Sequence, residues 1–404
     1  MDGGDGSSSH VYRVEQGEFE KLCDISSYDS IGNYYSYVTH LCGFKAHKHE
    51  GKITGLAAFG EPEYLDLLNG LITYKNGRIF NAGNCYYWSA IKKMKGILPN
   101  KFSKKNLACS IQDLLEEIVA NYVYYWVDKT EIIDIALAGG VFANVKLNQR
   151  LNELKNVDSV FIHPAMGDGG LAVGAAYAVW AEKLLDNGHL PTSYRLDNVY
   201  FGQEYSNEEI EDALNKAGLK AKYSNNVEQA VAQFVKDKKV VGWFNGKMEY
   251  GPRALGNRSI LADPTDASIN IWLNKRLKRT EFMPFAPSIL DTAASEFYIN
   301  YEKAKYPAKF MTITFDTTAE AIKKAPPTVH VDNTTRPQVV DKITNPSYYK
   351  ILQIYEEIKG LPLFINTSFN MHEEPIVCSP EDAIRALKTG AVDVLVMGNW
   401  IVKI

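Results

Sequence analysis

The chain has 404 residues, of which 46% are hydrophobic and 23% charged, and its formal net charge is −4 at pH 7. Since one hydrophobic core usually stops growing before this length, two domains of roughly 200 residues each are expected. The charge gives no general attraction to nucleic acid or to an acidic membrane, and no apolar run approaches the ~18 residues of a membrane-spanning helix.

The cysteines and the opening segment both bear on the compartment. The five cysteines are scattered and form no CxxC pair, which favours reduced thiols over a disulfide frame or a zinc site. The opening MDGGDGSSSH lacks the basic and apolar regions of a secretory signal. We therefore expect a cytoplasmic protein.

The first half of the chain contains two consecutive strand and helix units. Residues 131–141 form an apolar run that ends in two glycines, which predicts a buried parallel strand and a tight turn, and helical spacing follows. VDSVFIHPAMGDGG then predicts a strand and a Gly-rich loop, and LAVGAAYAVWAEKLL predicts a buried helix of small residues. Adjacent βα units are typical of an α/β domain with ligand loops at its strand ends.

The second half has the pattern of a separate α+β domain. Residues 184–206 lose periodicity and predict a linker. SNEEIEDALNKAGL then predicts a capped helix that ends in glycine, and KKVVGWFNG, LPLFINTSFN and DVLVMGNWIVKI predict strands. The expected domains are residues 1–190 and 196–404.

Three loops of the first half contain residues suited to phosphate or cation binding. The opening DGGDGSSS is compatible with a phosphate cradle beside a metal-binding aspartate, or with a disordered terminus. Gly139 and Gly140, with Asn144 one helical turn later, suit either a nucleotide contact or a plain tight turn. Asp168 lies between glycines before a helix, where it is either a cation ligand or a helix N-cap.

The segment HKHEGK at residues 47–52 contains an HxH pair. Such a pair invites a metal assignment, but two histidines without further ligands are more often solvated surface. Lys52, which follows Gly51, is better suited to contact a phosphate.

The second half contains basic and polar loops. EYGPRALGNRS presents Arg253 and Arg258 on a stiff turn, and guanidinium forks bind phosphate or carboxylate in a bidentate manner. The further segments are NKRLKRTEFMPFAP, with Lys275, Arg276, Lys278 and Arg279, then HVDNTTRPQ, with His330 and Arg336, and NTSFN, with Asn366, Thr367, Ser368 and Asn370. Each alone is compatible with a solvated face, but together, in an acidic chain, they predict a pocket for a small dianion.

Taken in order, these segments resemble the nodulation and antibiotic O-carbamoyltransferases over nearly the whole chain. The resemblance rests on DGGDGSSS, EGKITGLAAFG, LAGGVFANVKLN, HPAMGDGGLAVGAA, GWFNGKMEYGPRALGNRSILADP, MPFAPSIL, HVDNTTRPQ and LPLFINTSFNMHEEPIVCSPEDA. Chance agreement over EYGPRALGNRS, NTSFN and EPIVCSPEDA together is implausible.

The resemblance implies a fold and a reaction. The fold is a partial ASKHA domain, of the actin and Hsp70 ATPase type, over residues 1–190, followed by a YrdC-like carbamoyl-adenylate-forming domain over residues 196–404. Carbamoyl phosphate and ATP would give carbamoyl-adenylate, and the carbamoyl group would pass to a hydroxyl of a small molecule. The implied cofactors are ATP and a divalent metal bound by the first domain, Fe²⁺ by resemblance with Mg²⁺ as the alternative.

By motif, the resemblance also implies roles for individual residues. The anion holders for carbamoyl phosphate are Arg253, Arg258, Lys278 and Arg336. The polar neighbours of the substrate are Ser259, Arg279, Asn366, Thr367, Ser368 and Asn370. The nucleotide contacts are Asp5, Lys52, Gly139, Gly140, Asn144 and Asn148, and the metal ligands are Asp168 and Asp2. Because the reaction moves phosphate charge, positioning and electrostatic stabilisation would supply most of the catalysis.

The chain departs from the family pattern in three places. Family members carry a long segment ahead of the DGxGD loop, with a first phosphate loop and an HxxxH pair that supplies metal ligands. The loop itself is shortened here, so either Met1 or Asp2 stands at its metal-binding position, while Asp5 fits the second aspartate. Thr280 stands where an arginine is common, which leaves Arg279 as its substitute, and Glu373 replaces a usual glycine.

Three functional hypotheses follow. The first is an active carbamoyltransferase completed by a separate N-terminal chain, since an incomplete ASKHA domain would expose core and sheet edges. The second is a truncated protein that forms carbamoyl-adenylate without transferring the group. The third is a non-catalytic nucleotide- or phosphate-binding module. The sequence does not distinguish among hydroxylated acceptors.

Overall fold

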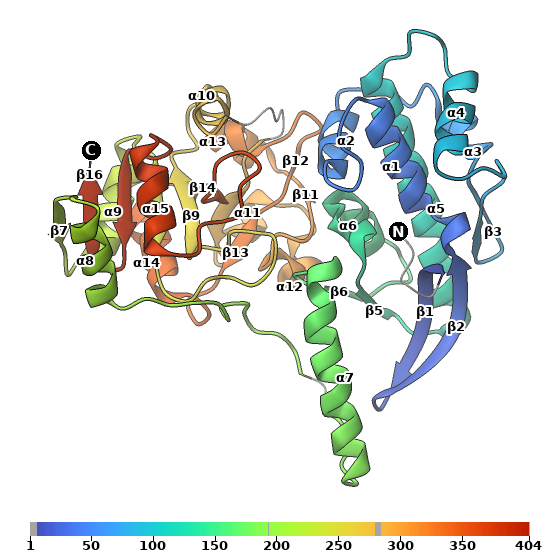
Figure 1. Cartoon of the computed structure of the whole chain (residues 1–404), viewed down its shortest axis with the longest axis horizontal. Coiled ribbons are helices and arrows are strands. Elements are labelled where there is room, and N and C mark those ends of the chain that lie inside the picture. The colour runs from blue at the N-terminus through green and yellow to red at the C-terminus, as the bar shows by residue number, and fades with distance from the viewer. Residues whose placement is uncertain (1–5, 193, 279–283, 404) are drawn as a thin grey trace. The chain divides into compact units, whose positions relative to one another are not determined.

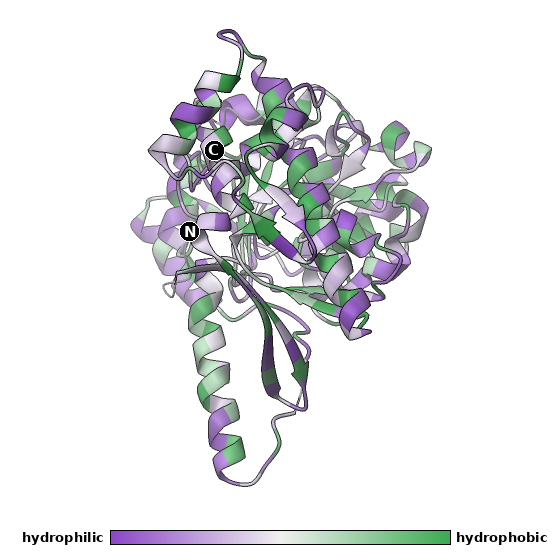
Figure 2. Cartoon of the chain, turned by 90° about the vertical axis from the view of Figure 1, so that its right-hand side faces the viewer, coloured by the Kyte–Doolittle hydropathy of each residue, from purple (hydrophilic) through white to green (hydrophobic). Residues whose placement is uncertain are grey.

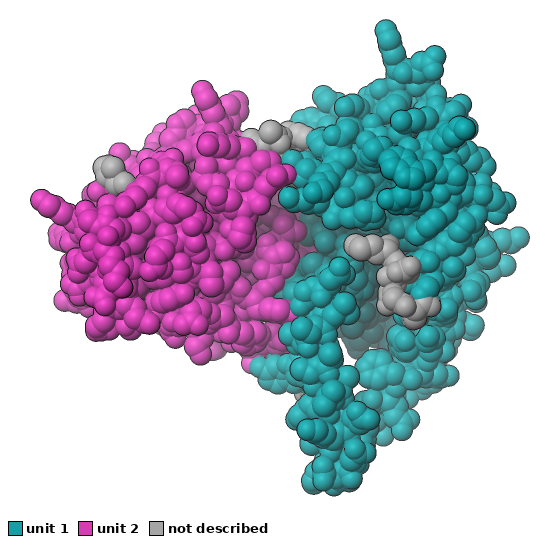
Figure 3. Space-filling model, in the orientation of Figure 1, with its two compact units in different colours: residues 1–195 teal, residues 196–404 magenta. Residues whose placement is uncertain are grey.

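The computed structural model describes residues 6–192, 194–278 and 284–403 (Figure 1). The chain divides into two compact units, Met1–Arg195 and Leu196–Ile404 (Figure 3). The division falls inside the stretch 184–206, where the sequence loses its periodicity.

Unit 1 is built around the long helix α5 (Lys104–Thr130). Its apolar residues recur at intervals of three and four and give one buried stripe, which includes Leu107, Ile111, Leu114 and Ile118. Packed against α5 are α1 (Ile31–Leu41), α2 (Glu50–Ala57), α3 (Leu65–Asn69) and α6 (Val145–Asn152). The other helical elements are η1 (Ser27–Asp29), α4 (Trp88–Ile97), η2 (Gly140–Ala143), η3 (Asp168–Gly170) and α7 (Leu171–Asp186).

The strands of unit 1 form three pairs. The antiparallel pairs are β1 (Ser7–Glu15) with β2 (Glu18–Ser26) and β3 (Thr73–Lys75) with β4 (Arg78–Phe80). The pair β5 (Asp134–Leu137) and β6 (Ser159–Ile162) is parallel, so the prediction of two consecutive βα units is confirmed.

The predicted burial of the first strand and of the last helix of these βα units is wrong. No residue of α7 is buried, and Leu171 and Val179 are 70% and 52% exposed. Figure 2 shows hydrophobic residues on this exposed helix, and in β5 only Leu137 is buried. A helix or sheet buries its apolar faces only against another layer, and the described part of unit 1 supplies none for α7.

Unit 2 contains an eight-stranded mixed sheet in the order β13-β10-β14-β9-β8-β15-β16-β7. Its strands are β7 (Ala221–Tyr223), β8 (Val241–Phe244), β9 (Arg258–Ala262), β10 (Pro287–Leu290), β13 (Gln338–Val340), β14 (Leu363–Ser368), β15 (Val394–Met397) and β16 (Trp400–Lys403). The pairs β10·β13 and β8·β15 are parallel and the others antiparallel. A separate pair joins β11 (Phe315–Asp316) and β12 (Thr334–Thr335).

Helices cover both faces of this sheet. The helical elements of unit 2 are α8 (Asn207–Lys216), α9 (Val227–Lys236), α10 (Ile269–Arg276), α11 (Ala294–Phe297), η4 (Tyr301–Ala304), α12 (Lys305–Ala308), α13 (Ala319–Lys324), η5 (Pro326–Thr328), α14 (Pro346–Lys359) and α15 (Pro380–Lys388). Successive strand residues alternate between faces, so Leu261 packs in the core with α9 and α14, while Ile260 packs in the core with α8 and α15. The result is a three-layer α/β unit.

Local signals of the second half predict its elements well. The predicted capped helix is α8, where Ser206 and Glu209 form a capping box. The strands predicted from KKVVGWFNG, LPLFINTSFN and DVLVMGNWIVKI are β8, β14, β15 and β16.

Two further observations concern the whole described chain. All five cysteines are free, and none forms a disulfide. Of the helices in the described part of the chain, none combines the length and the apolarity needed to cross a bilayer.

Candidate functional site

The loop 251–258, which carries Arg253, is held at its amide groups by one buried carboxylate. Glu249 is 5% exposed, and its Oε1 accepts hydrogen bonds from the backbone N–H groups of Leu255 (2.7 Å), Asn257 (2.8 Å) and Arg258 (3.0 Å). A carboxylate that accepts several N–H groups fixes a loop more strongly than a neutral acceptor does. The loop is therefore preorganised by its own sequence neighbour.

Carbonyl groups of the same loop are held from the sheet. Asn366 on β14 donates through Nδ2 to the carbonyl of Ala254 (3.1 Å), and Gln338 on β13 donates to the carbonyl of Leu255 (2.7 Å). Asn366 Nδ2 also lies 2.8 Å from Gln338 Oε1 and 3.0 Å from Ser288 Oγ. These side chains are almost fully buried, so a polar network on three adjacent strands supports the loop.

Arg258 lies inside unit 2. Its side chain has no exposed surface, and its guanidinium carbon lies 3.6 Å from the centre of the Phe244 ring. Its Nη1 and Nη2 donate to four carbonyl oxygens, those of Asn245, Gly246, Asn257 and Gln203. Burial lowers the pKa of Arg258, and the nearby Glu249 carboxylate opposes that shift. In this structure the guanidinium therefore holds the surrounding backbone together.

The predicted polar neighbours lie on two adjacent strands. Ser259 is a fully buried residue of β9, pairs with Ser368 across the sheet, and accepts a hydrogen bond from the Gly256 N–H. Thr367 pairs with Ile260 in the same ladder, and both Thr367 and Ser368 are half-buried. Ser368 Oγ donates to Asn370 Oδ1 (2.8 Å), so the NTSFN segment ends in an internally bonded turn.

The other predicted anion holders border this region in the fold. Lys278 is exposed and has a positive φ of 56°. The carbonyl of the preceding residue, Leu277, accepts a hydrogen bond from the N–H of His372, which lies just beyond NTSFN. Arg336 is half-buried and precedes β13 by two residues. Arg279 lies outside the described residues.

A cavity lies at another place in unit 2. It has a volume of about 210 Å³ and is lined by Asp291, Tyr301, Lys305, Lys309, Val339 and Asp341. Asp291 and Asp341 follow the carboxyl ends of the parallel strands β10 and β13, and Lys309 forms an ion pair with Asp341 at 3.0 Å. None of the predicted site residues that the structure describes lines this cavity.

In unit 1 the two Gly-rich loops meet at one end of the β5·β6 pair. The Gly139 N–H donates to the carbonyl of Met166 at 2.6 Å, and Gly139 has a φ of +119°. A Cβ placed on Gly139, Gly140, Gly167 or Gly169 would meet open space. The backbone of both loops is therefore accessible to a ligand, as close binding of a nucleotide phosphate requires.

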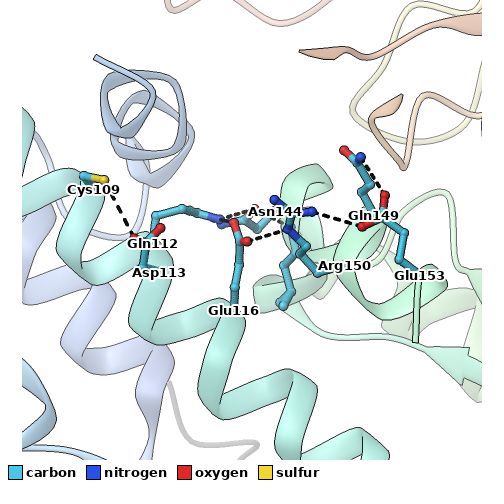
Figure 4. Close-up of polar contacts among 9 residues, drawn as sticks. Cys109, Gln112, Asp113, Glu116, Asn144, Gln149, Arg150 and Glu153 are labelled. Carbon is cyan, nitrogen blue, oxygen red and sulfur yellow. Dashed lines mark hydrogen bonds and ion pairs between the residues drawn. The ribbon is translucent and has the colours of Figure 1, made fainter. Parts of the chain in front are cut away.

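The predicted nucleotide contacts Asn144 and Asn148 hold the first loop in place. Asn144 Oδ1 caps α6 at the Leu147 N–H (3.1 Å), and its Nδ2 donates to Gln112 Oε1 at 2.8 Å (Figure 4). Asn148 is fully buried and donates through Nδ2 to the carbonyl of Phe142 at 2.7 Å. Both amides thus set the conformation of the segment after Gly140.

The helix that carries Lys52 is connected to this loop through polar side chains. Lys52 lies on α2, with its Nζ 5.9 Å from the centre of the Phe44 ring. Two residues later, Thr54 contacts the Tyr35 hydroxyl (2.9 Å), which donates to Gln112 Oε1 (2.8 Å). Gln112 is 4% exposed and joins α1, α2, α5 and the loop before α6.

The described donors do not by themselves fit an iron site. Asp168 is exposed on η3, whereas Asp2 and Asp5 lie outside the described residues. Within residues 6–192, 194–278 and 284–403, no three His, Cys, Asp or Glu side chains are arranged to hold a metal ion. One carboxylate is fewer ligands than iron takes in proteins.

Sequence reasoning missed the residues that support the site, chiefly Glu249, Gln338 and Gln112. A glutamate or glutamine in a polar segment has the pattern of a solvated side chain. For Glu249 one signal was present, since it precedes Gly251 and Gly256, both of which take positive φ. Such a loop needs an internal acceptor for its turned N–H groups.

Comparison with known proteins places the chain in a family. The model of the carbamoyltransferase N-terminus matches residues 1–177, and that of the carbamoyltransferase C-terminus matches residues 232–403. The chain therefore belongs to the carbamoyltransferase family, whose members are transferase enzymes, as its motifs predicted.

Several relatives match over almost the whole chain. An uncharacterised protein of Methanocaldococcus jannaschii is 35% identical over 99% of this chain and 77% of its own length. Nodulation protein NolO of Bradyrhizobium diazoefficiens is 32% identical over 100% of this chain and 74% of its own length. For nodulation protein NolNO of Sinorhizobium fredii the identity is 32%, and the match spans 100% of this chain but only 60% of that protein.

Solved structures match less well. The crystal structure of full-length HypF in a phosphate- and nucleotide-bound form is 20% identical, with a TM-score of 0.32. The match covers 44% of this chain and 22% of the HypF chain. A likeness of this size adds nothing to the family assignment.

Proposed function

We propose that this chain takes part in ATP-dependent O-carbamoyl transfer, with unit 2 forming carbamoyl-adenylate from carbamoyl phosphate and ATP. The observation that carries the proposal is the loop of residues 251–258, whose amides are held by Glu249 and whose carbonyls are held by Asn366 and Gln338. A rigid loop that carries an arginine is suited to bind a phosphate group at a fixed position. Family membership supports carbamoyl transfer as the reaction.

The proposed chemistry has two stages. Water cleaves carbamoyl phosphate to carbamate and phosphate, and a carbamate oxygen then attacks the α-phosphorus of ATP and displaces pyrophosphate. A hydroxyl of the acceptor next attacks the carbamoyl carbon, loses its proton and releases AMP. Arg253, Lys278 and Arg336 would hold the phosphate charge, with Ser259, Thr367, Ser368 and Asn370 as neutral hydrogen-bonding neighbours.

In this proposal the positive charges act mainly by position. They neutralise phosphate oxygens as negative charge shifts from the carbamoyl group to the leaving phosphate. Arg258 and Asn366 support the backbone of the loop, because their donors bind carbonyl oxygens. Arg279 remains a predicted contact outside the described residues.

Unit 1 would bind a nucleotide as well. Support comes from the accessible backbone at Gly139, Gly140 and Gly167, where a phosphate oxygen can approach the N–H groups. Lys52 and Asp5 would complete the contacts. Family membership supports, as a finer proposal, an ASKHA fold for unit 1 and a YrdC-like fold for unit 2.

The metal, the partner and the compartment are also proposals. A divalent metal, Fe²⁺ or Mg²⁺, would require Asp168 and Asp2 together with donors from elsewhere, and no step above involves it. A separate polypeptide chain that covers α7 is proposed because Leu171 and Val179 are exposed apolar residues. Free, scattered thiols support a cytoplasmic location.

The experiment is carbamoyl-phosphate-dependent release of pyrophosphate from ATP by the purified chain. Arg253→Ala is expected to lower the rate at least about 30-fold, because loss of a buried charge-assisted contact costs about 2–5 kcal/mol. Arg385→Ala is the matched control: Arg385 is an exposed arginine on α15 of the same unit, paired with Asp382 at 3.0 Å. Equal rates in the two variants would refute the role of Arg253.

The same assay separates the alternatives. Pyrophosphate release without carbamoylation of any supplied hydroxyl compound selects a protein that forms carbamoyl-adenylate but does not transfer the group. Nucleotide binding without any release selects a non-catalytic binding module.

A further inference from the structure

We propose that Glu249 is the positioning residue of the anion site: its buried carboxylate fixes the backbone that follows the phosphate-binding arginine. This inference rests on the proposed function, because it takes Arg253 to bind the phosphate group of carbamoyl phosphate. Glu249 itself would contact neither substrate.

The hydrogen bonds of Glu249 hold the amide groups in the second half of the loop. A single oxygen, Oε1, accepts from the N–H groups of Leu255, Asn257 and Arg258 within 3.0 Å. Between Arg253 and these amides, the carbonyl of Ala254 is bound by Asn366. The residue that immediately follows Arg253 is thus held through its carbonyl, and the one after it through its N–H.

The loop needs such an anchor because its backbone is unusual. Gly251 and Gly256 have φ values of 109° and 101°. A Cβ on Gly256 would lie 2.5 Å from the Tyr348 ring, so this glycine allows the loop to pack directly on a buried aromatic side chain. A chain in this conformation exposes several N–H groups on one side, and they require a common acceptor.

Glu249 is itself fixed in place. Its residue forms an isolated antiparallel bridge with Tyr200, whose hydroxyl donates to the carbonyl of Leu255 at 2.7 Å. The next residue, Tyr250, donates its N–H to the carbonyl of Val199 at 2.7 Å. The carboxylate therefore ties the loop to the neighbouring segment that contains Val199 and Tyr200.

The negative charge of Glu249 matters as well as its hydrogen bonds. The guanidinium of Arg258 is buried, and Glu249 is the strongest charge that favours its protonated form. Glu249 Oε2 is buried and has no hydrogen-bond partner among the described residues, so its charge is not dispersed by a second donor. A neutral amide at this position would keep an acceptor oxygen but would remove the strongest of the negative charges that favour the protonated Arg258.

The test compares Glu249→Gln with Asp263→Asn in the full chain. Asp263 is a matched control, because it is a buried carboxylate at the far end of β9, about 16 Å along the strand from Arg258. Two quantities are measured: amide hydrogen exchange in the loop, and the KM values for carbamoyl phosphate and for ATP. Binding of carbamoyl phosphate by calorimetry provides a reading that does not depend on turnover.

We expect Glu249→Gln to speed hydrogen exchange of the Leu255 and Asn257 amides at least about tenfold. The KM and the Kd for carbamoyl phosphate should rise by a similar factor, while the KM for ATP stays unchanged. Asp263→Asn should destabilise the protein and leave these loop amides and both KM values as they were. Glu249→Asp, whose shorter side chain keeps the charge, should recover part of the affinity.

The outcomes separate the two proposals. If the unaltered chain turns over carbamoyl phosphate and Glu249→Gln leaves its KM unchanged, the positioning role fails and the proposed function stands. If Asp263→Asn raises that KM equally, the effect is general destabilisation and the positioning role again fails. If the unaltered chain neither binds nor consumes carbamoyl phosphate, the proposed function fails and the inference fails with it.

Discussion

Replacement of Arg258 by methionine tests how the loop of unit 2 is held. Methionine matches the stem of arginine in length but removes the guanidinium and its charge. Two of the four carbonyl oxygens that Arg258 binds keep a backbone donor, since Asn257 O also accepts from Asn245 N–H and Gln203 O from Met248 N–H. The main cost is therefore the buried Glu249 carboxylate that loses its compensating charge.

The size of the effect follows from that uncompensated charge. Leaving a buried charge without its nearby opposite charge costs up to about 3–5 kcal/mol, which is a large part of the ~5–15 kcal/mol that stabilises a typical domain. The double variant Glu249→Gln with Arg258→Met removes both charges. We expect it to be destabilised by about 1–3 kcal/mol less than the sum of the single variants.

The assay is urea unfolding of the four proteins of this cycle, with the free energy of unfolding taken from the transition of unit 2. Arg385→Met, at an exposed position, is the control and should change that free energy by less than about 0.5 kcal/mol. The reasoning is refuted if Arg258→Met costs less than about 1 kcal/mol, or if the two substitutions prove additive within about 0.5 kcal/mol.

Three further predictions concern other parts of the chain. Gln112→Leu removes the acceptor of the Asn144 and Tyr35 donors. It should cost about 1–3 kcal/mol and weaken ATP binding in calorimetry, and unchanged ATP affinity would contradict the role of this network. Burial raises the pKa of Asp263, but hydrogen bonds from Thr265, Lys359 and Tyr355 outweigh this effect and lower the pKa. The ionised Asp263 therefore stabilises the fold above the ordinary carboxyl pKa of about 3.9, and this stabilisation is lost as the pH falls through the lowered value. The stability difference between wild type and Asp263→Asn should therefore be largest at neutral pH and close below about pH 4, and a difference that persists in acid would contradict the assignment. Trp180 on α7 has an indole that is 44% exposed. Trp180→Glu should change the free energy of unfolding by less than about 0.5 kcal/mol and reduce binding of a hydrophobic dye. A large loss of stability would mean that α7 is covered within the chain.

The sequence predicts elements that depend on local signals. The capping box of α8 is such a case, because Ser206 and Glu209 act within one turn of helix. The parallel strands β5 and β6 are another, since each is a short apolar run before a Gly-rich loop. Both kinds of signal lie within a few residues of the element that they define.

Burial and side-chain direction are not local in this way. The apolar composition of α7 is the same whether a second layer covers it or not, so its exposure could not be inferred. An arginine in a turn has the same pattern whether its guanidinium faces outward or, as for Arg258, contacts carbonyls from three segments inside the unit. The support from Glu249 depends on the closed loop, which only the folded chain shows.

The most direct test of the proposed function is exchange of labelled pyrophosphate into ATP. If unit 2 forms carbamoyl-adenylate reversibly, exchange should require both the purified chain and carbamoyl phosphate, fall at least about 30-fold in Arg253→Ala, and persist in Arg385→Ala. A folded chain that catalyses no exchange with carbamoyl phosphate present, or exchange that is equally fast in Arg253→Ala, would contradict the account.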